Sequence, residues 1–194
     1  MATGSPSDVA GVVVTLAAGR AVTLGGGRLV CVDGPAGSGK TTLAAEIAAR
    51  TGAVVIHGDD LMEGWGGFAT VSRQLVEVIT ELAAGRTGHY RVYDWHQGRF
   101  DASVSVPPGP WLVVEGVGSS EPAIAPYVTA LVWVEVDDEL RLARGLARDG
   151  DHLEQHWRTF MGSERDLFDR FRSQERADVL VDGTGARPPV VRPG

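Results

Sequence analysis

The stretch Gly34-Pro-Ala-Gly-Ser-Gly-Lys40-Thr41 decides the fold of this 194-residue chain. It fits the spacing G-x-x-x-x-G-K-[ST], in which backbone N–H groups surround phosphate oxygens, the lysine reaches the β- and γ-phosphates and the hydroxyl binds Mg²⁺. Lys40 is also the only lysine in the sequence. The planar fork of arginine, the other basic residue here, substitutes poorly for a compact ammonium inside a ring of amides. We therefore predict a nucleotide site made of Gly34, Pro35, Ala36, Gly37, Ser38, Gly39, Lys40, Thr41 and Thr42.

The segments on both sides of this loop have the strand and helix patterns that the motif requires. Residues 28–33 form a short apolar run rich in β-branched side chains, which is typical of a buried parallel strand. Residues 41–50 are rich in alanine with apolar side chains at helical spacing, and Gly52 is placed to end a helix. The unpaired N–H groups at the start of that helix would then face the bound phosphates.

Strand-like and helix-like segments alternate along the remaining chain. Strands are expected at residues 53–57, 111–115, 130–136 and 177–182, and helices at residues 69–84, 138–148 and about 152–172. This alternation predicts an α/β fold in which a five-stranded parallel sheet is flanked by helices. Residues 85–110 are rich in glycine, proline and aromatic side chains, so we expect a long functional loop there.

The length of the chain favours a single domain that spans residues 1–194. Its core is expected at about residues 28–183, with a flexible N-terminus and a flexible tail over residues 187–194. A lid is expected at about residues 138–160.

The amino-acid composition limits the kinds of ligand and partner that the chain is expected to bind. The net charge of −7 and the isoelectric point near 5.2 argue against a nucleic-acid surface, which carries a basic footprint. The single cysteine, Cys31, cannot form an internal disulfide, and it lies in an apolar segment typical of the core. We see neither a secretory leader nor an apolar run of membrane-spanning length. We therefore expect a cytoplasmic protein that acts on small molecules, and we leave a homodimer open.

Acidic side chains follow two of the predicted strands, at the edge where open α/β sheets bind ligands. Asp59 and Asp60 come directly after the second strand, and Glu115 ends the third. Phosphoryl transfer needs carboxylates near a metal and a group that accepts the proton of the attacking hydroxyl. We predict that Thr41, Asp59 and Glu115 surround Mg²⁺, that Asp59 is the base, and that Asp60 contacts substrate. The alternative is that these acids only cap the following helices.

Three arginines supply further positive charge. Arg141, Arg144 and Arg148 recur at i, i+3 and i+7 in a predicted helix, so they share one face. Such a row could close over a triphosphate as a lid, with Arg144 and Arg148 as catalytic cations. A solvated face paired with Asp and Glu is the alternative.

These landmarks occur in the same order in a known family. They are Val32-Asp-Gly-Pro-Ala-Gly-Ser-Gly-Lys-Thr-Thr42, Asp59-Asp60, Tyr93-Asp94-Trp95, Val114-Glu115-Gly116, Arg141-x-x-Arg144-x-x-x-Arg148-Asp149 and Ala177-Asp-Val-Leu-Val-Asp182. Over about residues 29–183 the chain resembles the uridine kinase and phosphoribulokinase branch of P-loop kinases, most of all its short actinobacterial uridine kinase-like members. The resemblance implies a P-loop kinase fold with a helical lid and Mg²⁺ held at Thr41, Asp59 and Glu115. It also implies that Asp59 is the base for a sugar hydroxyl.

The sequence departs from that family where the acceptor is held. Uridine kinases carry an aspartate in the helical segment after the second strand, whereas residues 61–92 contain none here. In that family two residues separate the Tyr-Asp-aromatic triplet from a histidine, whereas here His96 directly follows Trp95. The lid is shorter after Asp149 than is usual in that family. Recognition of base and ribose therefore does not carry over.

The chain has an aromatic and polar region of its own for an acceptor. Aromatic faces can stack on a planar base, and polar side chains can bind sugar hydroxyls. The predicted substrate contacts, besides Asp60, are Trp65, Tyr93, Trp95, His96 and Arg99. For Trp65 and Trp95 the alternative is that they only cover the edges of the core.

The sequence thus predicts an ATP- and Mg²⁺-dependent kinase that phosphorylates a hydroxyl of a nucleoside, uridine- or cytidine-like, or of a related metabolite. Other acceptors, such as a vitamin precursor, a sugar or an antibiotic, stay open. So does a P-loop regulatory module that hydrolyses ATP slowly or not at all. A guanine-specific switch reads its base with Asn-Lys-x-Asp, which a chain whose only lysine is Lys40 cannot contain.

Overall fold

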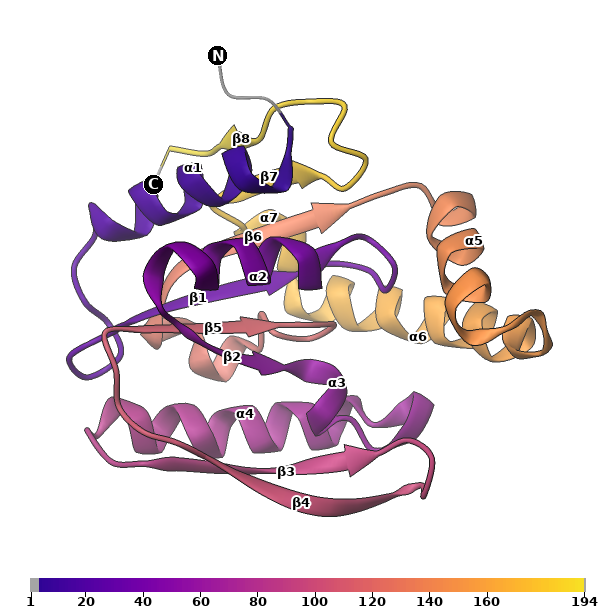
Figure 1. The fold of residues 1–194 in the computed structure, drawn as a ribbon, viewed down its shortest axis with the longest axis horizontal. Helices are drawn as coiled ribbons and strands as arrows, with labels where there is room; N and C mark the ends of the chain where they lie inside the picture. Colours follow the sequence, from indigo (N-terminus) through magenta and orange to yellow (C-terminus); the bar gives the residue numbers. More distant parts are fainter. Residues whose placement is uncertain (1–3, 194) are drawn as a thin grey trace.

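The computed structural model describes residues 4–193 and has a central sheet between two layers of helices (Figure 1). The sheet runs in the order β2-β5-β1-β6-β7-β8. Its strands are β1 (Arg28–Asp33), β2 (Val54–His57), β5 (Trp111–Glu115), β6 (Val128–Glu135), β7 (Val179–Asp182) and β8 (Val190–Val191). The first five are parallel to one another, and β8 pairs antiparallel with β7. The predicted α/β fold with a mainly parallel sheet is therefore confirmed, with one additional short antiparallel strand.

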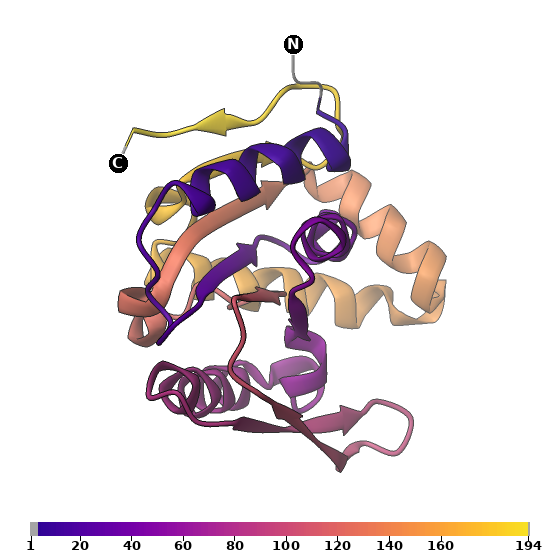
Figure 2. The ribbon, with the colours of Figure 1, turned by 60° about the vertical axis from the view of Figure 1, so that its left-hand side comes forward.

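The alternation of side chains in β1 divides the core in two. Val30 and Val32 point to the face covered by α1 (Pro6–Ala18) and α2 (Lys40–Thr51). Leu29 and Cys31 point to the opposite face, where α4 (Phe68–Ala83) and α6 (Glu154–Phe171) pack. Figure 2 shows the sheet between these two layers. Both faces of β1 are buried, as its continuous apolar run predicts.

The predicted long loop over residues 85–110 is wrong. Most of it forms an antiparallel hairpin, β3 (Gly88–Asp94) and β4 (Arg99–Val106), which packs against α4 and lies beside it at the bottom of Figure 1. In β3 the side chain of Tyr90 is buried, whereas Arg91 is exposed. Such alternation fits a sheet with one covered face, but glycine, proline and charged residues mask it in the sequence. The hairpin carries its tip, residues 95–98, toward the ligand-binding edge of the central sheet.

Both ends of the described chain carry regular elements. Residues 6–18 form the regular helix α1, which begins with the Ser5 hydroxyl accepting a hydrogen bond from the Asp8 N–H at 3.2 Å. Pro6 occupies its first turn, where a missing N–H costs nothing. In the tail, β8 adds to the sheet. Residues 1–3 and 194 lie outside the described part of the chain.

The remaining elements connect this core to the ligand-binding edge. They are α3 (Gly58–Leu61), η1 (Gly64–Gly66), η2 (Pro122–Tyr127), α5 (Asp138–Asp149), η3 (Asp151–Leu153) and α7 (Ser173–Arg176). The segment expected as a lid forms α5, η3 and the first turns of α6, at the right of Figure 1. Within residues 4–193, every helix is too short or too polar to cross a lipid bilayer.

Candidate active site

The predicted phosphate loop joins β1 to α2 with a sharply turned backbone. Gly34 has a φ of 141°, and a Cβ there would lie 2.0 Å from the carbonyl oxygen of Val134 on β6, so only glycine fits. The buried Asp33 carboxylate accepts hydrogen bonds from the N–H groups of Gly34, at 2.8 Å, and Gly118, at 3.1 Å. The loop is thereby anchored to β6 and to the segment that follows β5.

Lys40 is folded back onto its own loop. It is the first residue of α2, only 7% of it is exposed, and its Nζ donates to the carbonyl oxygen of Pro35 at 2.8 Å. The ammonium thus lies at the start of a helix among backbone groups, where a phosphate would be attracted both by the charge and by the unpaired N–H groups of α2.

Three polar side chains meet at the carboxyl ends of β2 and β5. Glu115 Oε1 accepts a hydrogen bond from the Thr41 hydroxyl at 3.1 Å and another from His57 Nδ1 at 2.7 Å. His57 and Glu115 are register partners in the parallel pair of β2 and β5, which explains their contact. The hydrogen bond to Glu115 raises the pKa of His57. No role is predicted for His57 from the sequence, although its position at the end of a strand is a signal that could have found it.

These groups suit a magnesium ion. Thr41 and Glu115 are already in contact, and Asp59 lines the same cavity. All three offer the oxygen ligands that Mg²⁺ prefers. Among residues 4–193, no group of three or more His, Cys, Asp or Glu side chains could hold a metal ion by itself. A site with only two carboxylates and a hydroxyl fits Mg²⁺, which usually completes its shell with water and substrate phosphates.

Asp59 and Asp60 differ in where they lie. Asp59 opens into the cavity, whereas Asp60 is not part of its wall. The surrounding protein raises the pKa of the Asp59 carboxyl by desolvation, and the charges of Lys40 and Arg148 partly offset this rise in pKa. Burial likewise raises the pKa of Asp60. The geometry therefore favours Asp59 over Asp60 for contact with a reacting group.

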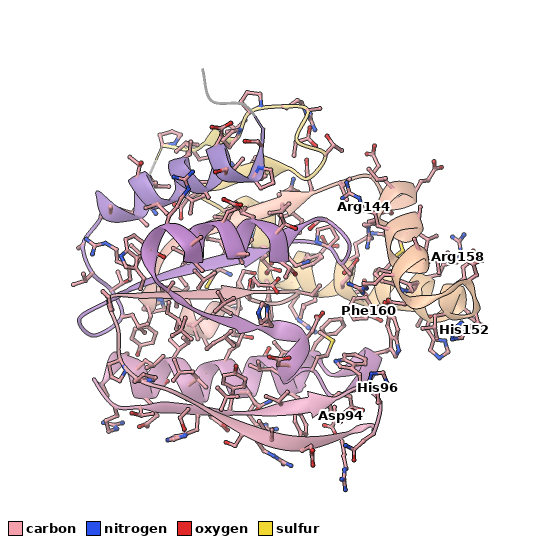
Figure 3. All side chains as sticks on the ribbon, viewed as in Figure 1. Asp94, His96, Arg144, His152, Arg158 and Phe160 are labelled. Atoms are coloured by element: carbon pink, nitrogen blue, oxygen red, sulfur yellow. The ribbon has the colours of Figure 1, made fainter. Side chains whose placement is uncertain are left out.

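A single cavity of about 770 Å³ joins the phosphate loop to the aromatic region. Figure 3 shows side chains from the hairpin tip, such as His96, and from α6, such as Phe160, around this part of the molecule. The residues of the cavity wall include Gly37, Gly39, Lys40, Thr41, Thr42, Asp59, Met62, Trp65, Trp95, His96, Glu115, Val117, Arg144, Arg148, Asp149, Leu153, Trp157 and Phe160. Of the predicted substrate contacts, Asp60, Tyr93 and Arg99 lie outside it, and the Arg99 guanidinium instead donates to Gln97 Oε1 at 2.7 Å.

The arginines of α5 do not act as one row. Arg144 Nη1 donates to the carbonyl oxygen of Gly37 at 3.1 Å, and Arg148 faces the cavity while paired with Asp149 at 2.7 Å. Arg141 is buried and binds Asp138 and Glu164. Its predicted place on a shared cationic face is therefore wrong, because tertiary packing turns its guanidinium into the protein.

Trp65 lies at the centre of an aromatic cluster. Its ring centroid is 6.0 Å from that of Trp95, 5.9 Å from that of Trp157 and 5.6 Å from that of Phe160, all edge to face, an arrangement favoured by the ring quadrupoles. The Trp95 N–H donates to the Asp59 carbonyl oxygen at 3.1 Å. The cluster thus connects the hairpin tip, η1 and α6, and one indole lies directly beside Asp59.

A second cavity of about 340 Å³ lies beside the phosphate loop and was not anticipated from the sequence. It shares Gly37, Gly39, Thr42 and Arg144 with the larger cavity. Its other wall is the turn after β7, residues 182–185, which the Asp182 carboxylate orders by accepting from Thr184 and Arg187. A Cβ on Gly183 would lie 2.2 Å from the Ser38 carbonyl oxygen, so this turn packs directly on the phosphate loop.

Part of the chain is similar in sequence to a known protein family. The model of the Phosphoribulokinase / Uridine kinase family matches residues 67–161. No curated protein matches the chain in sequence.

Three solved structures share the fold. A possible uridine kinase from Bacillus stearothermophilus superposes with a TM-score of 0.63 at 19% identity, over 90% of this chain and 97% of that one. A protein provisionally named a fructose transport system kinase, from Silicibacter sp. TM1040, gives a TM-score of 0.54 at 20% identity, over 89% and 95% of the two chains. The protein YGR205w gives a TM-score of 0.53 at 12% identity, over 86% and 90%.

Proposed function

We propose that this chain, which matches the Phosphoribulokinase / Uridine kinase family over residues 67–161 and shares the fold of a possible uridine kinase, transfers the γ-phosphoryl group of ATP, with Mg²⁺, to a hydroxyl of a nucleoside or a closely related metabolite. One observation carries the proposal. The phosphate loop, the Asp59 carboxylate and an aromatic compartment line the same cavity. A donor and an acceptor bound together there would hold the reacting oxygen close to the γ-phosphorus, which supplies much of the rate of such reactions.

The donor site would use the phosphate loop and α5. Lys40 exchanges its bond to the Pro35 carbonyl oxygen for the β- and γ-phosphates, and Arg144 lies against the same loop at Gly37. Thr41, Asp59 and Glu115 would hold Mg²⁺, which neutralises charge on the β- and γ-phosphates. The second cavity, between Arg144 and the turn after β7, has room for the base of the nucleotide.

The transfer step then needs a proton acceptor and balancing cations. The acceptor oxygen forms a bond to the γ-phosphorus, the bond from that phosphorus to the leaving oxygen of ADP breaks, and the hydroxyl proton passes to the Asp59 carboxylate. The position of Asp59 in the wall of the shared cavity supports this role, because a general base must lie within reach of the hydroxyl that it deprotonates. Arg148, in the cavity wall near Asp59, can neutralise charge on the moving phosphoryl group.

The side chains of the acceptor compartment favour an uncharged ring compound as the acceptor. Its walls are aromatic and apolar, namely Met62, Trp65, Trp95, Val117, Leu153, Trp157 and Phe160. Among the described residues of the cavity wall, the lysine and both arginines lie on the phosphate loop, α2 and α5, and only His96 could add positive charge near the hairpin tip. A phosphorylated sugar would need its own cations, whereas a nucleoside base can stack on indole faces. The compartment therefore favours a nucleoside over a sugar phosphate.

The proposal is tested by incubating the protein with Mg²⁺ and ATP and a panel of acceptors. The panel contains uridine, cytidine, purine nucleosides, sugars, sugar phosphates, vitamin precursors and hydroxyl-bearing antibiotics, and phosphorylated products are identified by mass spectrometry. We expect a phosphorylated nucleoside with the wild type and with the surface variant Arg73→Ala, and none with Lys40→Ala. Phosphorylation of another class alone would refute the nucleoside assignment. ADP without any phosphorylated acceptor would instead indicate a regulatory module.

A further inference from the structure

A buried ion pair behind the phosphate loop connects it to the helix that carries the cavity arginines. Glu164 on α6 is fully buried, and its Oε2 accepts a hydrogen bond from the Ala36 N–H of the loop at 2.9 Å. Its Oε1 accepts from Arg141 Nη1, and Arg141 on α5 is 2% exposed. One carboxylate thus touches both the phosphate loop and α5.

The contact between loop and helix is close along the backbone as well. A Cβ on Gly37 would lie 2.8 Å from the Arg141 carbonyl oxygen and 3.1 Å from its Cβ. One turn further along α5, Arg144 donates to the Gly37 carbonyl oxygen at 3.1 Å. The phosphate loop is therefore seated directly on the face of α5 from which Arg144 and Arg148 reach the cavity.

A carboxylate is an unexpected neighbour for a loop that binds phosphate, because its negative charge repels the ligand. Arg141 neutralises it, and Asp138 in turn accepts from Arg141 Nε at 2.8 Å and from Arg165 at 2.9 Å. An apolar pair of similar volume can stabilise a fold as well as a buried ion pair does. The stability of the fold therefore does not require the charges of Glu164 and Arg141. These charges are required to hold the Ala36 N–H and the Arg141 guanidinium in fixed directions.

We propose that Glu164 and Arg141 are positioning residues, which fix the phosphate loop at Ala36 to α5 so that Arg144 meets the bound triphosphate. The inference rests on the proposed function for its ligand, ATP. Neither side chain lines the larger cavity, so each acts through its neighbours. Without the pair, the loop and α5 move independently, and Arg144 no longer contributes a fixed charge to the donor site.

The first test is a double-mutant cycle that needs no acceptor. Binding of Mg²⁺ and ATP to the full chain is measured by calorimetry for wild type, Glu164→Gln, Arg144→Ala and the double variant. Glutamine keeps the shape of glutamate but has no charge and only one acceptor oxygen, so in Glu164→Gln the side chain cannot accept from both Ala36 and Arg141. We expect Arg144→Ala to weaken ATP binding about tenfold or more in the wild type and less than threefold in Glu164→Gln. Equal losses in both backgrounds would overturn the proposal.

A second variant and a surface control distinguish a loss of positioning from a folding defect. Glu164→Met with Arg141→Met replaces the whole pair by apolar side chains, which we expect to melt within a few degrees of the wild type while still lacking the coupling to Arg144. If the Met–Met variant is as stable as the wild type and Arg144→Ala weakens its ATP binding as much as in the wild type, the positioning role is refuted. Glu154→Gln breaks an exposed pair with Arg158 on the same α6 and should change neither quantity.

A further measurement keeps this inference separate from the proposed function. If the wild type does not bind ATP, the proposed function fails, and the pair is then judged without nucleotide by amide hydrogen exchange. We expect the Ala36 amide to exchange at least about tenfold faster in Glu164→Met with Arg141→Met than in the wild type, because methionine has no carboxylate oxygen to accept its hydrogen bond. An unchanged exchange rate would show that Glu164 does not hold the loop.

Discussion

Replacing Gly145 of α5 by alanine should displace this helix from the rest of the site. A Cβ built there would lie 2.4, 2.5 and 2.7 Å from three atoms of the Trp157 indole. Trp157 is 1% exposed, and its N–H donates to Asp149 Oδ2 at 3.0 Å. Since carbon atoms pack at about 3.5–4.0 Å, Gly145→Ala must move the indole or the helix by about 1 Å.

Two opposing effects set the size of the change in stability. Crowding a packed core costs about 1–3 kcal/mol, and alanine gains about 1 kcal/mol over glycine in a helix. We expect a net loss of about 1 kcal/mol in the free energy of unfolding, which lowers Tm by about 2–4 °C for a chain of this size. The loss in rate should be larger, because α5 carries Arg144 and Arg148 into the cavity and a displacement of about 1 Å can cost about 100-fold.

The matched control is Gly162→Ala on α6, where a Cβ would meet nothing within 4 Å. This variant should gain about 0.5–1 kcal/mol from helix propensity alone and keep its rate. Thermal unfolding by circular dichroism and steady-state phosphorylation of the acceptor found in the panel measure both effects. A Gly145→Ala protein that melts as high as Gly162→Ala and turns over at the wild-type rate would refute the packing argument. Removing the indole with Trp157→Leu should abolish the penalty of the added methyl.

Three further predictions concern single side chains. Asp59→Asn should lower kcat by at least 100-fold with ATP affinity within about threefold of the wild type, measured by calorimetry; a near-normal rate would mean that another group accepts the proton. The pKa of Asp182 is about 2, lowered by hydrogen bonds from Thr184 and Arg187, so Asp182 stabilises the fold at neutral pH and this contribution is lost as pH falls from about 4 to about 2. Denaturant unfolding should therefore show Asp182→Asn less stable by about 1 kcal/mol at pH 6, with the difference vanishing near pH 2; a difference independent of pH would contradict the assignment. Burial raises the pKa of the Cys31 thiol, so thiol reagents should label it only as fast as the protein unfolds, and rapid labelling of the native protein would contradict its place in the core.

Local sequence patterns predicted much of the arrangement around the glycine-rich loop before α2. The strand at residues 28–33 agrees with the structure at both ends, and that at 111–115 does too. Parallel pairing then brings strand ends to one edge, so Thr41, Asp59 and Glu115 line one cavity, as expected from their order along the chain. Their roles in binding Mg²⁺ and in proton transfer remain predictions.

Contacts between segments that are far apart in the chain could not be predicted from local sequence patterns. The sequence of residues 88–106 resembles a loop because its turn residues and charges hide the alternation of a hairpin, which is explained only by its packing against α4. Arg141 was placed on a cationic face by helical spacing, yet Glu164, 23 residues later, draws it inward. Spacing along a helix fixes which side chains share a face, but the direction of a long side chain depends on its partners.

By itself, the sequence determined the class of fold and the phosphate site, because both depend on residues close together in the chain: a strand, a glycine-rich turn, Lys40 and the helix that follows. The tertiary structure alone decided which aromatic side chains enclose the cavity of about 770 Å³. It also decided that His57 meets Glu115 and that a buried carboxylate at residue 164 holds the phosphate loop. Those contacts join separate elements, and their geometry is fixed only when the two layers pack against the sheet and exclude water from between them.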